Sequence, residues 1–423
     1  MDNTKLKKFK YLMMLILAAL ALISLIQGCK NAIQYSQDFQ WDAAKVLTLR
    51  MNPYDLSLNP TDELKALGYE EYYLQMEANQ FPSLLWILFP YTLLPPLAAR
   101  YAWLFSNLVF TALLAWLFYK LFFKPGNRDE FIIVTLAMIS GMPWRNHIGV
   151  GQHTIFALTF FLLSVTLCKS AKDNTGGRKW LLFFLSAFCL AVSFFKYTLT
   201  APLALYYVYK RRYDILGLAV LPHIILTAFS ARWLNDSFMN MIKKPLQVAS
   251  WLAGGGSLDI GAVIGSISPS LASKSVLLTG VFMALLFVYV LMIPAGFDRE
   301  LLTVLTLWSM VITYHRIYDY FVLALCAPGV WLIASALIRN GQTDASEDEK
   351  DNAREGDLIS RVLKSPDMIL YLAALLVIFY LIRVFHEAVF IMVAAGVLYY
   401  ALTIFMTVGL WSQLHFSKRS GEK

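Results

Sequence analysis

The sequence carries little charge. Only 15% of its 423 residues are Asp, Glu, Lys or Arg, while 58% are hydrophobic and 15% are aromatic. With a mean hydropathy of +0.57, the chain is too apolar for a water-soluble fold. Apolar runs of roughly 20 residues, the length that a membrane-spanning helix needs, recur along it. The composition therefore predicts an all-α, polytopic membrane protein, because lipid cannot satisfy the open edge of a sheet.

Several site types are absent from the sequence. The four cysteines, Cys29, Cys168, Cys189 and Cys326, show neither paired nor metal-type spacing. No Cys, His and Asp set has the spacing of a metal site, and there is no Gly-rich phosphate loop or nucleophile elbow. These absences argue against a zinc protein, a P-loop nucleotide-binding protein and an α/β-hydrolase.

The formal net charge of +8 does not indicate nucleic acid, because the basic residues sit at helix ends instead of forming a basic domain. The run KLKKFK precedes the first apolar segment, and no small-residue cleavage site follows, so this segment is predicted to be a retained helix. Placing the N-terminus in the cytoplasm puts most of the Lys and Arg on the inside. We therefore predict a multi-pass protein of the plasma (inner) membrane with both termini cytoplasmic.

About 12 spans are expected, in three parts. Residues 1–339 are predicted to form a transmembrane catalytic module that includes a long external loop at 29–80. The polar, acidic stretch 340–365 is predicted to be a flexible cytoplasmic linker, and 366–423 the last helices and a tail. The expected helices lie near 11–28, 100–122, 130–144, 152–168, 179–195, 197–209, 214–231, 275–295, 299–314, 318–338, 366–384 and 387–411.

The apolar segment 82–96 is expected to be an interfacial or re-entrant piece. It is short, and Pro90, Pro95 and Pro96 limit regular helix there. A full span at this point would also move Lys120, a basic helix-end residue, to the outside, against the charge bias.

Five polar groups fall at helix ends on the predicted outer face. They are Asp38 with Asp42, Arg100, the run from Trp144 to His153, Lys196, and the run from Tyr314 to Asp319. One such group would be an interface anchor or a snorkelling cation. The convergence of acids, bases and cations around one loop is what an outward-facing site requires.

The residue types in these groups suit a transfer from a lipid phosphate. Developing negative charge on a phosphate needs cations, for which Lys196, Arg145 and Arg316 are candidates. An acceptor hydroxyl needs a base, which Asp38 can supply if it stays ionised.

Each candidate has a structural alternative. Asp38 could instead cap the helix that contains Ala43 and Ala44. Asp42, four residues on, could share its helix face, and we favour a structural salt bridge for it. His315 could be a plain interface histidine or part of a proton relay with Arg316 and Asp319, and Lys196 could simply snorkel.

Four motifs in chain order resemble the GT-C class of membrane glycosyltransferases, and in particular glycosyltransferase family 87, the polyprenol-phosphate-mannose-dependent mannosyltransferase-like family. The resemblance covers most of residues 10–340. The motifs are Asp38-Phe39-Gln40-Trp41-Asp42-Ala43-Ala44 with Asn52-Pro53-Tyr54, Gly151-Gln152-His153-Thr154-Ile155-Phe156, Lys196-Tyr197-Thr198-Leu199-Thr200-Ala201-Pro202, and Tyr314-His315-Arg316. Trp41 stands where the family has Tyr, and Leu49-Arg50-Met51 stands where a Gly is usual.

The resemblance implies a GT-C-like fold and an inverting transfer of mannose or a similar sugar from a polyprenyl-phosphate donor to an acceptor hydroxyl on the outer face. Asp38 would be the base and His315 its proton partner. The implied partners are a lipid-linked donor, a glycan or glycolipid acceptor and membrane lipid, without a cofactor or an expected divalent metal. Donor-side groups would be Lys196, Arg316 and Gln152. To these we add our own predictions from the residues, Arg145 on the donor side and, as acceptor-binding or loop-shaping groups, Asp42, Asn52, Tyr54 and His147.

Two other functions stay open. A secondary transporter or flippase fits the number of spans, although transporters place ionisable sites near the midplane between repeated halves, and neither repeats nor midplane charges are visible here. A non-catalytic lipid-binding or scaffold subunit is the third possibility.

Overall fold

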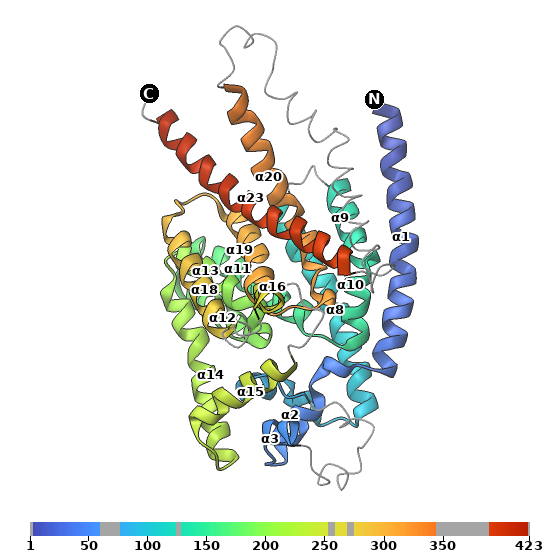
Figure 1. The fold of residues 1–423 in the computed structure, drawn as a ribbon, viewed down its shortest axis with the longest axis vertical. Helices are drawn as coiled ribbons and strands as arrows, with labels where there is room; N and C mark the ends of the chain where they lie inside the picture. The colour runs from blue at the N-terminus through green and yellow to red at the C-terminus, as the bar shows by residue number, and fades with distance from the viewer. Residues whose placement is uncertain are drawn as a thin grey trace.

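The computed structural model describes residues 3–59, 77–123, 128–252, 259–268, 275–343 and 389–421, and in these ranges every regular element is helical. Figure 1 shows that the two ends of the chain lie at the same end of the molecule, whereas α2 (Trp41–Thr48), α3 (Pro53–Leu58) and α15 (Phe238–Leu252) gather at the opposite end. The all-α prediction is confirmed.

Five segments of the described residues are long and apolar enough to cross a membrane. They are Lys10–Gln34, Pro96–Phe122, Thr154–Lys172, Gly176–Tyr209 and Tyr213–Trp233. The chain is thus an integral membrane protein, and the fuller figure of about 12 spans stays a prediction. The predicted span 366–384 lies outside the described residues, as does most of the predicted linker, whose first residues continue α20 (Val322–Thr343).

The remaining helices complete the bundle. They are α1 (Asn3–Gln34), α8 (Pro96–Phe122), α9 (Arg128–Ser140), α10 (Met142–Val150), α11 (Thr154–Lys172), α12 (Gly176–Ser193), α13 (Tyr197–Tyr209), α14 (Tyr213–Trp233), α16 (Ile260–Ile267), α18 (Ser275–Met292), α19 (Asp298–Ile312) and α23 (Val389–Gly421). Two differences from the sequence prediction matter for the site. The first helix continues to Gln34, which shortens the external loop, and a break at Gly141 makes α10 a separate helix.

The segment 82–96 does not form a span. It folds into three short pieces, α6 (Pro82–Leu85), η2 (Trp86–Leu88) and α7 (Phe89–Thr92). Pro82 and Pro90 lie in the first turns of α6 and α7, and Pro96 is the first residue of α8, because a proline is tolerated in a first turn but cannot continue a preceding helix. Two hydrogen bonds attach α2 to α7, from Trp41 Nε1 to the Tyr91 carbonyl (2.9 Å) and from Lys45 Nζ to the Thr92 carbonyl (3.1 Å). The segment therefore supports α2.

Buried apolar side chains form two clusters. The larger one lies between the long helices, and the smaller one contains Phe39, Trp41, Trp103, Phe156 and Phe195. The smaller cluster packs directly against the chain that carries the candidate site, so it fixes that chain on the bundle.

Ion pairs tie helix ends on the side away from this cluster. Lys10 of α1 pairs with Glu130 of α9 at 2.9 Å, and Lys210 at the end of α13 pairs with Asp298 of α19 at 2.5 Å. These basic residues belong to the end that the charge bias predicts to be cytoplasmic.

Candidate functional site

A polar cavity of about 140 Å³ lies where distant parts of the chain meet. Its main walls are η1 (Gln37–Phe39), the turn after α10, η3 (Phe194–Lys196) and η4 (Ile317–Asp319) with the residues before it, and residues 77–80, which include Glu77, and Ala249 of α15 complete the lining. The side chains that matter most for the chemistry are Asp38, Gln152, Lys196, Tyr314, Arg316 and Tyr318. Four candidates from separate stretches of sequence, Asp38, Gln152, Lys196 and Arg316, thus share one cavity.

A single 3₁₀ turn presents Asp38 to the cavity. The turn is bracketed by Ser36 (φ 39°) and Gln40 (φ 61°), two non-glycine residues in the left-handed region, which is costly and is found where surrounding structure enforces it. Here the enforcing contact is Phe39, whose ring stacks on Trp103 at 5.0 Å between centroids. Gln40, not Asp38, is the residue that precedes α2, so Asp38 is not the N-cap of that helix.

Two neighbours hydrogen-bond to the Asp38 carboxyl. Gln152 Nε2 donates to Asp38 Oδ2 at 3.1 Å, and the Tyr318 hydroxyl donates to the same side chain. Gln152 is placed by Gly151, whose φ of +72° ends α10 and whose Cα faces Ser36 and Phe39 so closely that a Cβ would lie 3.3–3.4 Å from them. The turn after α10 therefore fits against the turn that carries Asp38.

Burial raises the pKa of the Asp38 carboxyl above its ordinary value. Lys196, the Tyr318 hydrogen bond and Arg316 act in the opposite direction, in that order, and stabilise the ionised form. A carboxylate whose pKa is moved upward while cations keep it ionised is suited to accepting a proton.

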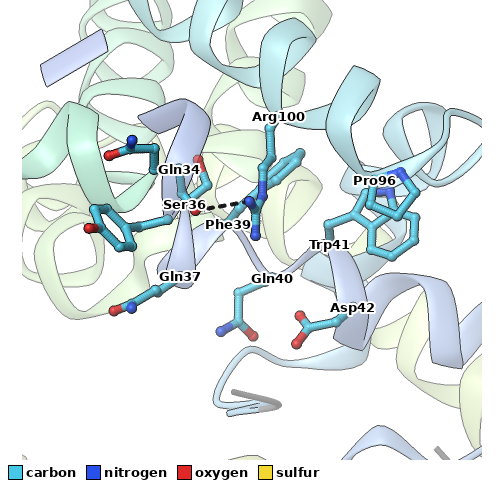
Figure 2. A pocket seen from close by; sticks show the side chains of 10 residues that line it. Gln34, Ser36, Gln37, Phe39, Gln40, Trp41, Asp42, Pro96 and Arg100 are labelled. Carbon is cyan, nitrogen blue, oxygen red and sulfur yellow. Dashed lines mark hydrogen bonds between the residues drawn. The ribbon is translucent and has the colours of Figure 1, made fainter. Parts of the chain in front are cut away.

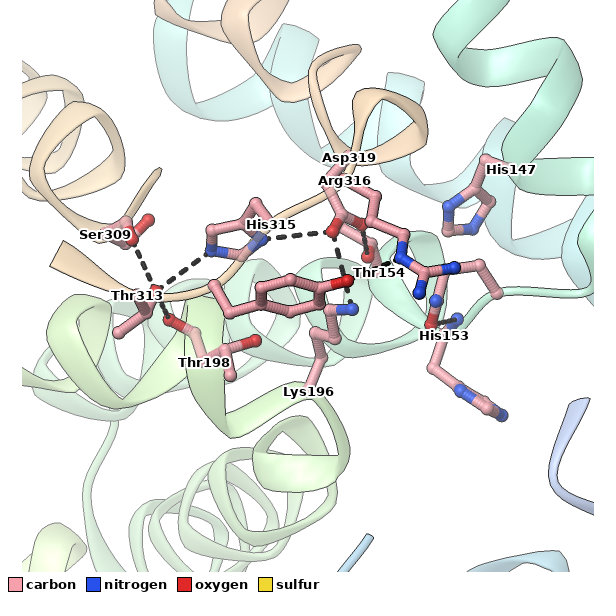
Figure 3. Close-up of polar contacts among 12 residues, drawn as sticks. His147, His153, Thr154, Lys196, Thr198, Ser309, Thr313, His315, Arg316 and Asp319 are labelled. Atoms are coloured by element: carbon pink, nitrogen blue, oxygen red, sulfur yellow. Dashed lines mark hydrogen bonds and ion pairs between the residues drawn. The ribbon is translucent and has the colours of Figure 1, made fainter. Parts of the chain in front are cut away.

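Lys196 reaches the cavity at a break between two helices. Its backbone (φ −116°, ψ 65°) interrupts the path from α12 to α13. Its Nζ lies 3.4 Å from Asp319 Oδ2, and its side chain is only 11% exposed. Figure 3 shows Lys196 pointing toward Asp319 of η4. A buried ion pair holds this lysine, which argues against simple snorkelling.

Asp319 is the centre of this polar cluster. Besides Lys196, its fully buried carboxylate accepts hydrogen bonds from the Thr154 hydroxyl and from His315 Nδ1, the latter at 3.0 Å. Burial alone would raise the pKa of Asp319, but Lys196 and His315 hold it well below its usual range. Asp319 is therefore an anion that fixes the position of Lys196.

His315 lies behind the cavity wall. It is 1% exposed, its Nδ1 donates to Asp319, and its Nε2 lies 3.1 Å from Thr313 Oγ1 (Figure 3). His315 contacts Asp319 and not Asp38, so this geometry gives it a positioning role through Asp319, and its part in a proton relay stays a prediction.

Arg316 contributes a second cation. Its Nε donates to the Tyr314 hydroxyl, and its guanidinium carbon lies 5.9 Å from the centre of the Tyr314 ring. Both residues line the cavity beside Asp38. Two positive side chains and the Asp38 carboxyl thus face a common space, and Glu77 adds a second carboxyl to its lining.

Asp42 does not share a face with Asp38, contrary to the sequence prediction. The left-handed residue Gln40 turns the chain between η1 and α2, so the two carboxyls line different cavities. The predicted salt bridge is not found among the described residues. Asp42 Oδ1 accepts from the Ala43 amide at 2.9 Å, and Lys45 donates elsewhere.

Arg145 and His147 stay outside the Asp38 cavity. Arg145 Nη1 donates to Gln27 Oε1 of α1 at 2.6 Å. His147 is buried against Phe321, and its Nε2 accepts from the Ile155 amide at 3.3 Å. Burial lowers the pKa of His147 to about 3, which keeps it neutral. Both residues join helices in this structure.

Asn52 and Tyr54 shape the segment that contains α3. The Asn52 side-chain oxygen caps α3 by accepting from the Tyr54 and Asp55 amides. The buried Tyr54 hydroxyl donates to the carbonyl of Gln80, a residue of the cavity wall, at 2.8 Å. Of the two roles that the sequence left open for them, loop shaping is the one these contacts support.

Sequence reasoning did not select Tyr318 or Thr154 as site residues, and it named Asp319 only as a possible relay partner of His315. Tyr318 and Asp319 belong to a polar run that the sequence did single out, but only the 3₁₀ turn shows which of its side chains face Asp38 and Lys196. Thr154 belongs to the motif that begins at Gly151, yet a threonine at the start of a helix does not indicate a hydrogen bond to a carboxylate far away in the sequence.

Comparison with known proteins decides the family. The model of glycosyltransferase family 87 matches residues 82–315, more than half of the chain. The chain belongs to glycosyltransferase family 87. As a member of family 87 it is a membrane glycosyltransferase, which agrees with its apolar helices. The matched range contains Gln152 and Lys196 and ends at His315, whereas Asp38 lies before it. No curated protein and no solved structure matched the chain.

The donor set of the family 87 site is not that of a metal centre. Within the ranges the structure describes, no group of three or more His, Cys, Asp or Glu side chains is arranged to hold a metal ion. The polar cavity instead offers two carboxyls, those of Asp38 and Glu77, among amide, hydroxyl and cationic groups, and independence of a divalent metal stays a prediction.

Proposed function

We propose that this family 87 protein transfers a sugar, mannose or a similar one, from a polyprenyl-phosphate donor to an acceptor hydroxyl, with inversion at the anomeric carbon. The observation that carries the proposal is the common cavity of Asp38, Lys196 and Arg316. A carboxylate base near two cations is the arrangement that such a reaction needs.

Asp38 accepts the proton of the acceptor hydroxyl as the new bond from oxygen to the anomeric carbon forms. The bond from that carbon to the phosphate oxygen breaks, and the lipid phosphate leaves with its electron pair. Lys196 and Arg316 stabilise the charge that develops on the leaving phosphate. Because a phosphate leaves as an anion and needs no acid, one base suffices, and a single displacement inverts the configuration.

The position of the cavity supports an outer-face reaction. Asp38 follows the end of α1 farthest from the N-terminus, and the external helices α2, α3 and α15 lie at the end of the molecule opposite the two termini (Figure 1). With cytoplasmic termini, this end faces outward, where a lipid-linked donor and a glycan or glycolipid acceptor would meet.

The test is product formation by purified protein in lipid nanodiscs. Incubation with polyprenyl-phosphate mannose, glucose or arabinose and an octyl glycoside acceptor is expected to release polyprenyl phosphate and a glycosylated product of inverted anomeric configuration. Movement of lipid-linked sugar across proteoliposomes without any covalent product would instead establish the flippase alternative. Binding of the donor without turnover would favour the scaffold alternative.

A change at Tyr318 is expected to move the pH dependence of transfer. The base must be ionised, so kcat/KM falls as pH drops below the pKa of Asp38, which burial raises and the Tyr318 hydrogen bond lowers. Tyr318→Phe removes that hydrogen bond, so the pKa of Asp38 rises and the acidic limb of the profile moves to higher pH. The measurement is the pH profile of kcat/KM.

Tyr197→Phe is the matched control, since it removes another hydroxyl of the same cavity wall. Its acidic limb should match that of the unchanged protein. An equal shift in both variants, or a shift to lower pH in Tyr318→Phe, would contradict the assignment of Asp38 as the titrating base.

A further inference from the structure

A second polar cavity, of about 160 Å³, lies on the other side of the turn that carries Asp38. Figure 2 shows side chains from the end of α1, from η1, from the start of α2 and from α8 around it. Its polar lining consists chiefly of Gln34, Gln37, Gln40, Asp42 and Arg100, with the indole of Trp41 beside them. The mechanism above uses none of these side chains.

Gln40 belongs to both cavities. Its side chain is 6% exposed, and its Nε2 donates to the Glu77 carbonyl at 2.9 Å. Its Oε1 is buried and has no hydrogen-bond partner among the described residues. A buried amide oxygen without a donor is costly, so a ligand that offers a hydroxyl there would be favoured.

Asp42 gives the second cavity a carboxyl. It is 8% exposed, and Figure 2 shows it pointing to the same side as the Gln40 amide. Burial raises the pKa of Asp42 to about 7. A carboxyl that exchanges its proton near neutrality can both accept hydrogen bonds from hydroxyl groups and donate to them.

Arg100 closes the cavity from α8. Its Nη1 donates to the carbonyls of Ile33 and Gln34 at 3.3 and 3.2 Å, the last turn of α1, where a cation also complements the helix dipole. Because the Arg100 guanidinium is already hydrogen-bonded to the last carbonyls of α1, the lining gives no preference for an anionic ligand such as phosphate.

The lining and the size together select the ligand class. Amide, carboxyl and guanidinium groups hydrogen-bond hydroxyls, and an indole packs against the apolar face of a sugar ring. At about 160 Å³ the cavity is smaller than the roughly 300–1,000 Å³ of sites that enclose a whole drug-sized ligand. It suits one ring, and its polarity does not suit a lipid chain.

We propose that the second cavity binds a neutral hexose of the acceptor glycan, next to the sugar whose hydroxyl faces Asp38. This inference rests on the proposed glycosyl transfer and names the acceptor as one with at least two sugar units. Gln40, which lines both cavities, contacts the acceptor at the linkage between its two sugars. Asp42 determines the preference for the longer acceptor.

The test compares two acceptors, an octyl monohexoside and an octyl dihexoside, with the donor found active in the release assay. The unchanged protein is expected to use the dihexoside with a KM lower by about tenfold, the effect of one or two hydrogen bonds to a sugar. Asp42→Leu is expected to remove this preference by raising the dihexoside KM about tenfold. Its kcat, its donor KM and its monohexoside KM should stay unchanged.

Asp173→Leu, which changes an exposed carboxyl after α11, is the matched control and should preserve the preference. Asp42→Asn, which keeps the shape and part of the hydrogen bonding, should raise the dihexoside KM less than Asp42→Leu and provides the test if the leucine variant does not fold.

Equal use of both acceptors by the unchanged protein would overturn the inference while leaving glycosyl transfer established. An unchanged dihexoside KM in the Asp42 variants, or an equal loss of kcat on both acceptors, would also overturn it. If neither acceptor is glycosylated while the donor binds, the proposed function itself fails, and this inference fails with it.

Discussion

Asp38→Asn is expected to slow glycosyl transfer by roughly 10²–10⁴-fold, the usual contribution of a general base. Asparagine has nearly the same shape as aspartate and can still accept from Gln152 Nε2, which lies 3.1 Å from the present carboxylate. It cannot take up the acceptor proton. The measurement is kcat with saturating donor and acceptor, together with the donor Kd by titration.

Donor binding should survive in this variant, because Lys196 and Arg316 remain in the cavity. Asp55→Asn, a change of an exposed carboxyl on α3, is the control and should leave kcat within about twofold of the unchanged protein. Normal turnover by Asp38→Asn would remove Asp38 from the mechanism, and loss of donor binding would reassign it to the donor site.

Lys196→Met is expected to reduce both activity and stability, for separable reasons. Activity should fall roughly 10²–10³-fold, because a cation that stabilises the leaving phosphate is removed. Stability should fall by an amount of the order of 3 kcal/mol, because Asp319, fully buried, loses the ammonium 3.4 Å away. Single-turnover rates and thermal unfolding measure the two effects.

The double variant Lys196→Met/Asp319→Asn separates these two effects. Neutralising Asp319 removes the unpaired charge, so the thermal midpoint should recover most of its loss, while the rate stays low because the cation is still missing. Recovery of both quantities would show that Lys196 acts only as the partner of Asp319. Recovery of neither would show that the ion pair is not what the stability depends on.

The helical fold could be predicted from composition and spacing. Apolar runs indicated the spans, and the three prolines between 90 and 96 indicated that residues 82–96 would not cross the membrane. The convergence of Asp38, Gln152, Lys196 and Arg316 followed from placing each polar group at a helix end on one side. The apolar spans and the side on which each polar group lies follow directly from hydrophobic periodicity and from the charge bias.

The orientation of single side chains could not be predicted in this way. Spacing of four residues suggests that Asp38 and Asp42 share a face, but the left-handed Gln40 lies between them and turns them toward different cavities. Such a backbone conformation is enforced by tertiary contacts, here by Phe39 on Trp103, and not by the local sequence.

The polar contacts of His315 and Asp319 behind the cavity could not be predicted from the sequence for a similar reason. His315 and Asp319 are four residues apart, yet they meet across a 3₁₀ turn and not along a helix. Asp319 becomes the partner of Lys196 only when segments more than a hundred residues apart pack together. The local pattern indicated only a possible relay with His315 and gave no sign that Asp319 would pair with Lys196.

The ion pair between Lys196 and Asp319 has a consequence for biogenesis. During synthesis, the lysine is inserted long before its aspartate partner leaves the ribosome, and Tyr318, which steadies the proton acceptor, arrives at the same late moment. A nascent chain that ends before these residues lacks a working centre. On the proposed mechanism, a chain cut short before Asp319 is expected to be inactive.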